Sequence, residues 1–455
     1  MLFSLPSSQD FSFYALRRKK FIEAVKAEHP GKTGAIVLFG AFEGERVAFR
    51  QESSVYYLSG IQEPGIVLFL DFNGKMILYV PNCVENRAKW VFSSVPLTQE
   101  NAQKLGFDEI RTLGSVCAGY QFHPFFPREE YSDLLSVFEK MAQDGKTIFT
   151  FTPDNAYGYA EQRLLLQRLR EFVPVITQQL VDVSPVIATM RRSKDMHEID
   201  QLYKAVEITA VAQEAAAGAI ADGMRECEVQ GSLEYMMTSS GARTSFPSIV
   251  ASGKNSTVLH YNINTGTMKN GDLVVVDIGA EFGCYAADLT RTYPVSGHFT
   301  KRQREVYDIV LATQEYIAGL AKPGMWLSNE NFPEQSLNHL ARAFLTKKGY
   351  GKYFPHGIGH FLGLDVHDVG NQAESLQEGD IITIEPGIYI PEERIGIRIE
   401  DNYWIVADGV VCLSENLPKT ADEIEFMVQQ TLDDAEESDL DEENMFEEED
   451  EDNGH

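Results

Sequence analysis

The segment from residue 271 to residue 292 constrains the fold most, because it places acidic residues inside an apolar hairpin. It reads Gly-Asp-Leu-Val-Val-Val-Asp-Ile-Gly-Ala-Glu-Phe-Gly-Cys-Tyr-Ala-Ala-Asp-Leu-Thr-Arg-Thr. The Leu-Val-Val-Val run predicts a buried strand, and the last nine residues predict its antiparallel return. A turn centred between Phe282 and Gly283 places Asp277 directly opposite Asp288, with Cβ atoms about 5 Å apart. Two carboxylates this close in a core repel each other and lose solvation, so they predict a proton-sharing dyad or one side of a metal site.

A second acidic hairpin is predicted over residues 381–400, which read Ile-Ile-Thr-Ile-Glu-Pro-Gly-Ile-Tyr-Ile-Pro-Glu-Glu-Arg-Ile-Gly-Ile-Arg-Ile-Glu. A turn centred between Glu392 and Glu393 places Glu385 directly opposite Glu400. A β-bulge would shift either register by one residue. Taken alone, each of these glutamates would be expected on an exposed strand face. Beside the aspartate pair, they are expected to bind a metal.

A glycine-containing loop, His356-Gly-Ile-Gly-His360, lies between the two hairpins. Its glycines disfavour a helix, so the two histidines do not form the helix-face pair of a zincin site. With His360 as the imidazole donor, four carboxylates predict two divalent metal ions whose four charges balance them. Such donors favour manganese, with cobalt, zinc or iron as alternatives. Two metal ions about 3.5–4 Å apart can generate a hydroxide nucleophile and polarise a carbonyl group.

Several other polar residues near these motifs are candidates for contact with substrate. We expect His356 and His367 to donate to substrate or to carry protons. The alternative for each is a buried histidine with a structural role. Arg398 precedes Glu400 by two residues and therefore shares its strand face, where it can orient that carboxylate or bind a substrate carbonyl or carboxylate. A lone histidine such as His260 is usually structural, and its assignment to the site depends on a family resemblance.

The chain of 455 residues is expected to form two domains and a tail. Residues 1–178 alternate strands and helices, as in an α/β layer domain. Because no glycine-rich loop joins a strand to its helix there, nucleotide binding is unsupported. Residues 179–430 place four helices among antiparallel hairpins, which predicts an α+β domain with the helices on one face. Residues 431–455 form an acidic segment without apolar periodicity and are expected to be disordered.

The expected helices of the second domain have recognisable ends. Ser193 is expected to cap a helix that runs to about residue 221, and Thr300 to cap one that ends near residue 322. The other two helices are expected over residues 226–239 and about 333–348.

Charge and cysteine content limit the possible partners and compartment. The formal net charge is −29, and the last 24 residues hold 14 of the 68 acidic residues and no Lys or Arg. An acidic body argues against binding to nucleic acid or to anionic membranes. The five cysteines are scattered without Cys-x-x-Cys spacing, so neither a disulfide framework nor a thiolate zinc site is expected. With no signal-peptide pattern and no long apolar stretch, we expect a soluble, cytoplasmic protein.

Five motifs together resemble the pita-bread metallopeptidases, above all aminopeptidase P and prolidase. They are Gly-Asp-Leu-Val-Val-Val-Asp-Ile-Gly-Ala, Asp-Leu-Thr-Arg-Thr-Tyr-Pro, His-Gly-Ile-Gly-His-Phe-Leu-Gly-Leu-Asp-Val-His-Asp, Ile-Glu-Pro-Gly-Ile-Tyr and Gly-Ile-Arg-Ile-Glu-Asp. The stretch that begins at Phe49, Phe-Arg-Gln-Glu-Ser-Ser-Val-Tyr-Tyr-Leu-Ser-Gly, is similar to the creatinase-type N-terminal domain of that family. The resemblance covers nearly the whole chain ahead of the acidic segment.

The resemblance implies a role for each candidate residue. The ligands of two metal ions, usually manganese, would be Asp277, Asp288, His360, Glu385 and Glu400. Glu385 would also shuttle a proton for a bridging hydroxide. His260 and His367 would line the substrate site, His356 would contact substrate near the prolyl pocket, and Arg398 and Tyr389 would support it. A homo-oligomer, either a dimer or a tetramer, is also expected.

The expected reaction is hydrolysis of an Xaa-Pro bond, with the metals and His367 stabilising the tetrahedral oxyanion. The motifs Asp-Leu-Thr-Arg-Thr-Tyr-Pro and Gly-His-Phe-Thr-Lys-Arg-Gln-Arg-Glu favour aminopeptidase P, which removes the residue before proline. The alternative is prolidase, which is restricted to dipeptides. A non-catalytic pita-bread binding protein or a metal-free creatinase-like hydrolase would be expected to lack ligands, and all five are present. The simplest methionine aminopeptidases lack the large N-terminal domain.

Overall fold

A computed structural model of the protein describes residues 10–44, 46–82, 87–91, 98–117, 119–124, 126–152, 160–371 and 373–429. The acidic segment 431–455 and Cys83 lie outside these residues. The chain divides into two compact units, Met1–Arg191 and Arg192–His455, which we describe separately.

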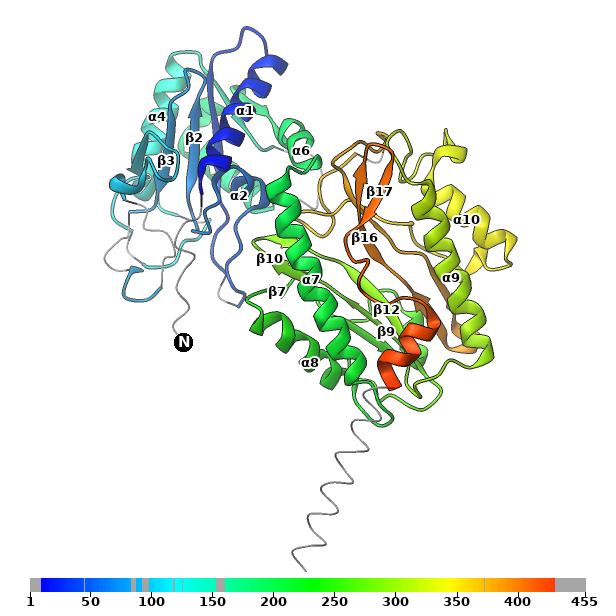
Figure 1. Cartoon of the computed structure of the whole chain (residues 1–455). Coiled ribbons are helices and arrows are strands. Elements are labelled where there is room, and N and C mark those ends of the chain that lie inside the picture. The colour runs from blue at the N-terminus through cyan, green and yellow to red at the C-terminus, as the bar shows by residue number, and fades with distance from the viewer. Residues whose placement is uncertain are drawn as a thin grey trace, which may run out of the picture. The chain divides into compact units, whose positions relative to one another are not determined.

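A six-stranded mixed sheet with the order β4-β3-β2-β1-β5-β6 forms the centre of the first unit (Figure 1). Its strands are β1 (Gly34–Phe39), β2 (Val67–Asp71), β3 (Met76–Val80), β4 (Glu109–Thr112), β5 (Thr147–Thr150) and β6 (Leu180–Asp182). Its helices include α1 (Ser12–Glu28), α2 (Ser53–Ser59), α4 (Ser132–Gln143), α5 (Ala160–Phe172) and α6 (Ser184–Arg192). Strand β1 is buried along its whole length, as its apolar sequence predicts. The expected α/β layer arrangement is confirmed.

The two units divide after Arg191, whereas the boundary expected from the sequence follows residue 178. Strand β6 lies beyond residue 178 and pairs in parallel with β5, so it belongs to the sheet of the first unit. The sequence of β6 does not indicate that this strand pairs with β5.

The described residues of the second unit include four long helices, as expected. They are α7 (Met196–Gly218), α8 (Glu226–Ser239), α9 (Lys301–Leu320) and α10 (Leu337–Lys347). Thr300 caps α9 as predicted, in a capping box with Gln303. The prediction that Ser193 caps α7 is wrong, because Asp195 accepts from the backbone N–H of Glu198, which reciprocates. The pattern Asp-x-x-Glu at residues 195–198 is itself a capping-box sequence. The residue that indicates the start of α7 therefore lies two positions after Ser193.

The strands of the second unit form small antiparallel sheets. Their orders are β11-β10-β7, β12-β9-β8, β13-β16-β17 and β14-β15. The strands are β7 (Arg243–Thr244), β8 (Ile249–Ser252), β9 (Leu273–Ile278), β10 (Ala280–Phe282), β11 (Tyr285–Ala286), β12 (Leu289–Pro294), β13 (Ile381–Ile384), β14 (Gly387–Ile390), β15 (Ile395–Arg398), β16 (Asp401–Val406) and β17 (Gly409–Cys412). Helix α7 contacts β9 to β12, and α9 contacts β13 to β15 (Figure 1). This arrangement is the expected α+β unit.

The register of the first hairpin differs from the prediction by two residues. Its turn is Gly283-Cys284, with φ of 57° and 69°, so both turn residues are left-handed as in a type I′ turn. Asp277 therefore pairs with Thr290 instead of Asp288. The same register places Gly279 opposite Asp288, and a Cβ on Gly279 would come within 1.9 Å of the carbonyl oxygen of Ala287. Because side chains alternate with a period of two, the two aspartates still share one face of the hairpin.

The register of the second hairpin is the predicted one. Gly387 pairs with Arg398 in β14–β15, and Ile384 pairs with Asp401 in β13–β16. The two ladders continue one another in the same register. Glu385 therefore lies opposite Glu400, at the point where one ladder ends and the other begins.

The two hairpins join at Thr290 and Glu400, which form an isolated antiparallel bridge. Arg291 secures this junction from within the core. Its guanidinium donates to the backbone oxygens of Thr290 and Glu400 at 2.9 and 2.8 Å, and to a carboxylate oxygen of Asp401 at 2.7 Å. Both side chains of the Arg291–Asp401 pair are fully buried.

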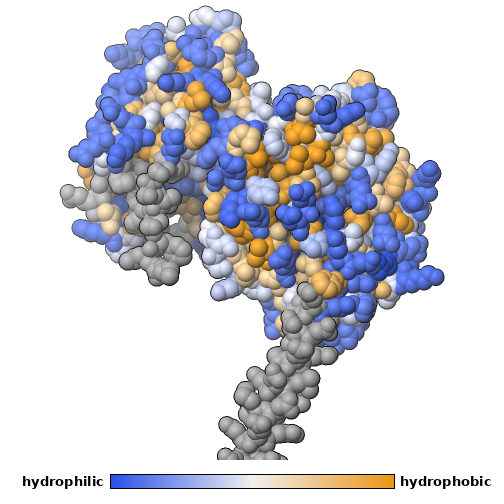
Figure 2. All heavy atoms as spheres, in the orientation of Figure 1, coloured by the Kyte–Doolittle hydropathy of each residue, from blue (hydrophilic) through white to orange (hydrophobic). Residues whose placement is uncertain are grey.

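Within the described ranges, no helix is long and apolar enough to cross a membrane. Figure 2 shows apolar residues scattered among hydrophilic ones on the visible surface of the second unit. Cys117, Cys227, Cys284 and Cys412 are free thiols.

We expect Arg291→Met to lower the free energy of unfolding by about 3–5 kcal/mol, because it removes the buried guanidinium that holds the junction and leaves the buried Asp401 carboxylate with the partly exposed Lys419 as its cation. Urea unfolding followed by circular dichroism measures the loss. The control is Lys204→Met, which removes one side of an exposed ion pair on α7 and should leave the midpoint nearly unchanged. Equal effects of the two substitutions would contradict the structural role of the buried pair.

Candidate active site

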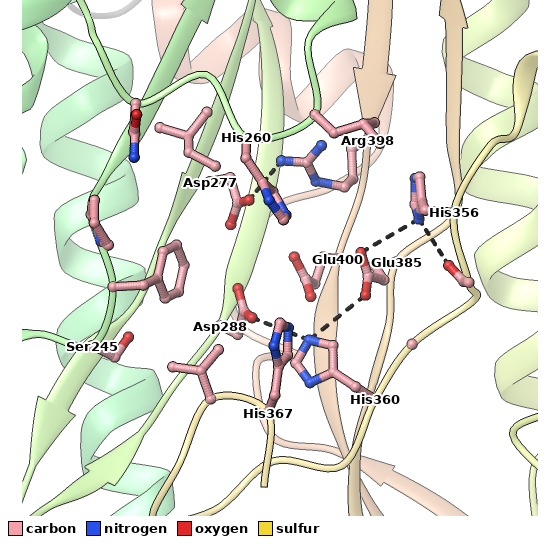
Figure 3. A pocket seen from close by; sticks show the side chains of 18 residues that line it. Ser245, His260, Asp277, Asp288, His356, His360, His367, Glu385, Arg398 and Glu400 are labelled. Carbon is pink, nitrogen blue, oxygen red and sulfur yellow. Dashed lines mark hydrogen bonds and ion pairs between the residues drawn. The ribbon is translucent and has the colours of Figure 1, made fainter. Parts of the chain in front are cut away.

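One cavity of about 690 Å³ in the second unit is lined by nine of the ten candidate residues. They are His260, Asp277, Asp288, His356, His360, His367, Glu385, Arg398 and Glu400 (Figure 3). The tenth, Tyr389, is buried beside the cavity and contacts His356 and Arg398. Five apolar residues also line the cavity: Phe246, Pro247, Ile249, Leu259 and Val366.

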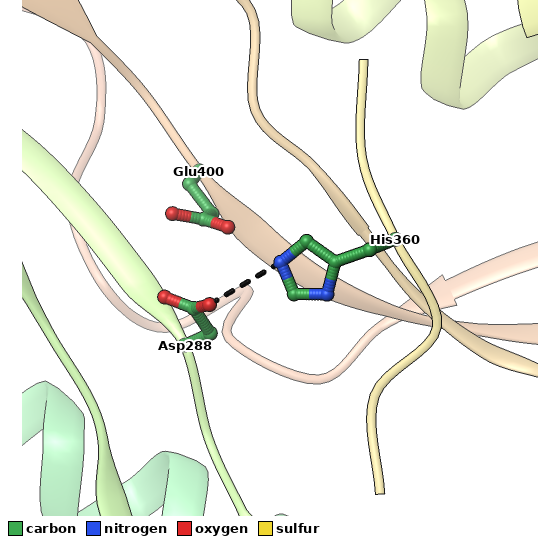
Figure 4. Close-up of side chains that lie close together, drawn as sticks. All are labelled: Asp288, His360 and Glu400. Atoms are coloured by element: carbon green, nitrogen blue, oxygen red, sulfur yellow. Dashed lines mark ion pairs between the residues drawn. The ribbon is translucent and has the colours of Figure 1, made fainter. Parts of the chain in front are cut away.

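Acidic side chains from both hairpins converge on His360. Asp288, His360 and Glu400 each offer a donor atom, and these atoms all lie within 4.8 Å of one another (Figure 4). Nε2 of His360 lies 3.4 Å from Oδ2 of Asp288 and 3.7 Å from Oε1 of Glu385. The donors come from three separate segments of sequence, so the junction of the hairpins is what assembles them.

The hydrogen bonds of the cluster leave two buried oxygens available to a cation. Asp277 accepts from Arg398 through Oδ2 at 2.6 Å, and Glu400 accepts from Thr290 through Oε2 at 2.8 Å. The second oxygens, Oδ1 of Asp277 and Oε1 of Glu400, are buried and have no hydrogen-bond partner among the described residues. Buried polar atoms are normally satisfied. Together with the oxygen-rich donor set, these two atoms fit a site for divalent metal ions.

Three acidic residues and His360 of this cluster have shifted pKa values because they lie close together and are shielded from solvent. Burial raises the pKa of Asp288 to about 6 and that of Glu385 to about 7, and it raises the pKa of Glu400 well above its ordinary value. Burial opposes charge on His360 as well, but its contact with Asp288 and the charge of Glu385 raise its pKa to about 9. The cluster therefore retains protons near neutral pH that metal ions would displace.

A directed chain of hydrogen bonds forms one wall of the cavity. Arg398 donates to the Tyr389 hydroxyl at 2.8 Å, and that hydroxyl lies 3.0 Å from Nε2 of His356. Nδ1 of His356 lies 2.8 Å from the carbonyl of Gly357 and must carry the hydrogen, so Nε2 accepts from Tyr389. Burial and the charge of Arg398 lower the pKa of His356 to about 3, and burial raises the pKa of Tyr389 to about 12. His356 is therefore neutral and has a fixed tautomer.

His367 is the second neutral imidazole of the cavity. Its ring lies edge-on to that of His360, with centroids 4.3 Å apart. Burial and the neighbouring His360 lower its pKa. The adjacent Asp368 forms a buried ion pair with Lys194 at 3.0 Å, which anchors the end of this loop.

His260 is exposed and lies at the rim of the cavity. The segment around it is attached to the start of α8 by the fully buried carboxylate of Glu226. Glu226 accepts from Ser252, Asn255, Tyr261 and the backbone N–H of Gly266.

Three of these supporting residues were not predicted from the sequence. Thr290 could have been found, because it follows Asp288 by two residues and therefore shares its strand face. Lys194 and Glu226 lie far in sequence from the residues they hold. A single sequence contains no feature that indicates which residues Lys194 and Glu226 contact.

The fold and the site together define a pita-bread metallopeptidase. Residues 200–407 match metallopeptidase family M24, and residues 14–118 match the aminopeptidase P N-terminal domain. The chain belongs to the aminopeptidase P and prolidase family of pita-bread metallopeptidases, as the sequence motifs indicated.

Relatives of both branches are similar over most of their length. The chain is 32% identical to the Xaa-Pro aminopeptidase of Escherichia coli (strain K12) over 90% of this chain and 96% of that protein. It is 40% identical to the Xaa-Pro dipeptidase of Pyrococcus furiosus over 84% of this chain and 95% of that one. The structure of E. coli aminopeptidase P with the inhibitor Pro-Leu superposes with a TM-score of 0.76, at 30% identity, covering 94% of this chain and 100% of that chain.

We expect Asp288→Asn to abolish metal binding and turnover while the protein stays folded, because Asp288 contributes a carboxylate at the centre of the donor cluster. Elemental analysis measures the metal content, and circular dichroism checks the fold. Asp272→Asn is the control, since that carboxylate lies just before β9 and pairs with Arg394 outside the cavity. If the Asp288 variant keeps its metal and its activity, the ligand assignment is wrong.

We also expect metal binding to release protons at pH 7, because protonated ligands must lose their protons to bind a metal ion. His360, with a pKa of about 9, and part of the Glu385 population, with a pKa of about 7, are protonated before the metal binds. Affinity should therefore fall as the pH is lowered from 8 to 5. Calorimetric titration in buffers of different ionisation enthalpy measures the release, and the same heat in every buffer would contradict it.

Proposed function

We propose that the protein is an Xaa-Pro aminopeptidase that removes the first residue of peptides with proline second. The observation that carries this proposal is the convergence of four carboxylates and one imidazole in a cavity that also holds two neutral histidines. The family match of the N-terminal unit and the E. coli relative support the aminopeptidase branch.

Two divalent metal ions would be held by Asp277, Asp288, His360, Glu385 and Glu400. When bound, they would polarise the scissile carbonyl and activate a water molecule. The oxygen-rich donors favour manganese, with cobalt, zinc or iron as alternatives. Cytoplasmic localisation and a homo-oligomer remain predictions from the sequence.

The protein's own side chains would handle protons and substrate. Glu385 lines the cavity 3.7 Å from His360, where its carboxylate would take up and return a proton. His367 is neutral and can donate one N–H to the developing oxyanion. His356, with its tautomer set by Gly357 and Tyr389, and His260 at the rim would contact the peptide. Arg398 would hold Asp277 and Tyr389 in place.

Prolidase is the second candidate, and the similarity to the P. furiosus dipeptidase favours it. Both activities need the same donors and the same cleaved bond. They differ in the length of peptide that the cavity accepts.

We expect the manganese-loaded protein to cleave Xaa-Pro-Xaa tripeptides and to release the free N-terminal residue. The basis for selection is the tertiary amide that proline forms, which lacks an N–H. Mass spectrometry of the products measures the cleavage, with Gly-Pro and peptides of three to eight residues compared in parallel. The matched control replaces proline by alanine and should remain uncut.

Hydrolysis of Gly-Pro with no action on any longer peptide would overturn the aminopeptidase assignment in favour of prolidase. Cleavage of the alanine peptides at the same rate would overturn selection for proline.

A further inference from the structure

Two buried glutamines occupy equivalent places behind the two carboxylate pairs. Gln213 lies on α7 and Gln314 on α9, and both side chains are completely buried. Nε2 of Gln213 donates to the carbonyl oxygens of Val276 and Leu289, at 3.1 and 2.9 Å. Nε2 of Gln314 donates to the carbonyl oxygens of Ile384 and Ile399, at 3.2 and 3.3 Å.

The four accepting carbonyls belong to residues adjacent to the acidic ligands. Val276 precedes Asp277, and Leu289 follows Asp288. In the second hairpin, Ile384 and Ile399 directly precede the two glutamates. Each planar amide therefore joins the two backbone segments that carry one carboxylate pair.

The other end of each amide is also fixed. Oε1 of Gln213 accepts from the hydroxyl of Tyr293 on β12 at 3.0 Å, and Oε1 of Gln314 accepts from Nζ of Lys419 at 3.3 Å. These bonds set which end of each amide is the donor. An amide held at both ends has little freedom to let the two carbonyls separate.

We propose that Gln213 and Gln314 are positioning residues for the metal site. Each holds two ligand-bearing backbone segments at the separation that lets their carboxylates share metal ions. The inference rests on the ligand assignment in the proposed function. Residues that orient ligands from behind typically change metal affinity about 10- to 100-fold when they are substituted.

The test is the affinity of purified full-length Gln213→Met and Gln314→Met for Mn²⁺ and Zn²⁺, measured by competition with a fluorescent chelator. Methionine keeps the length of the side chain and removes its donor and acceptor. We expect each variant to bind metal at least about tenfold more weakly than the wild type. Hydrogen exchange should also increase in residues 273–278 of the first variant and 381–384 of the second.

The control is Gln303→Met, which removes another buried glutamine donor, from α9 to the carbonyl of Gly271, away from the cluster. It should lower the melting temperature of the metal-free protein without changing metal affinity. Wild-type affinity retained in both site variants would overturn the proposal. Failure of the wild type itself to bind metal would instead overturn the ligand assignment.

A milder variant covers the case in which a methionine variant does not fold. Tyr293→Phe removes the hydroxyl that fixes Gln213 and leaves the amide in place. It should weaken metal binding in the same direction but by a smaller factor. Unchanged affinity in a folded Tyr293→Phe protein would count against the role of Gln213.

Discussion

The repulsion among four carboxylates, three of them buried and that of Glu385 half-buried, is the constraint on which the second unit depends. Arg398 contacts Asp277, and Thr290 donates to Glu400, but in these two carboxylates one oxygen stays buried with no hydrogen-bond partner among the described residues. A protein core tolerates such a cluster only when cations or protons neutralise it and rigid surroundings hold it. Burial raises the pKa of Asp288, Glu385 and Glu400, which favours protons in that role. The donor geometry shows that metal ions could replace them.

The rigid surroundings come from neutral and charged groups behind the ligands. Arg291 connects the two hairpins through backbone oxygens, and the two helix glutamines connect the two segments of each hairpin. Lys194 and Glu226 hold the segments that carry His367 and His260. The helices therefore do more than cover the sheets, because their buried polar residues determine where the acidic side chains point.

The sequence predicted the glutamate pair and its register correctly because the turn between β14 and β15 lies where its Pro-Glu-Glu-Arg sequence suggests. The aspartate register was wrong by two residues, because cysteine is an unusual residue for a left-handed turn and Cys284 was assigned to a strand. The error did not change the predicted site, since a shift of two keeps each side chain on the same face. The residues behind the ligands could not be predicted, because most of their partners lie 26 to 174 positions away in the chain and only the folded structure brings them together.

Gly279 has a consequence for how this protein can change over evolutionary time. Any amino-acid substitution at this position adds at least a Cβ, which would collide with the opposite backbone beside Asp288. Relaxation elsewhere cannot absorb a clash between two main chains of the same hairpin, so selection should remove each such allele as it arises. The position is therefore a useful diagnostic in newly sequenced genes: a chain that has lost this glycine should also have lost the proposed metal site, even where all five proposed ligands remain.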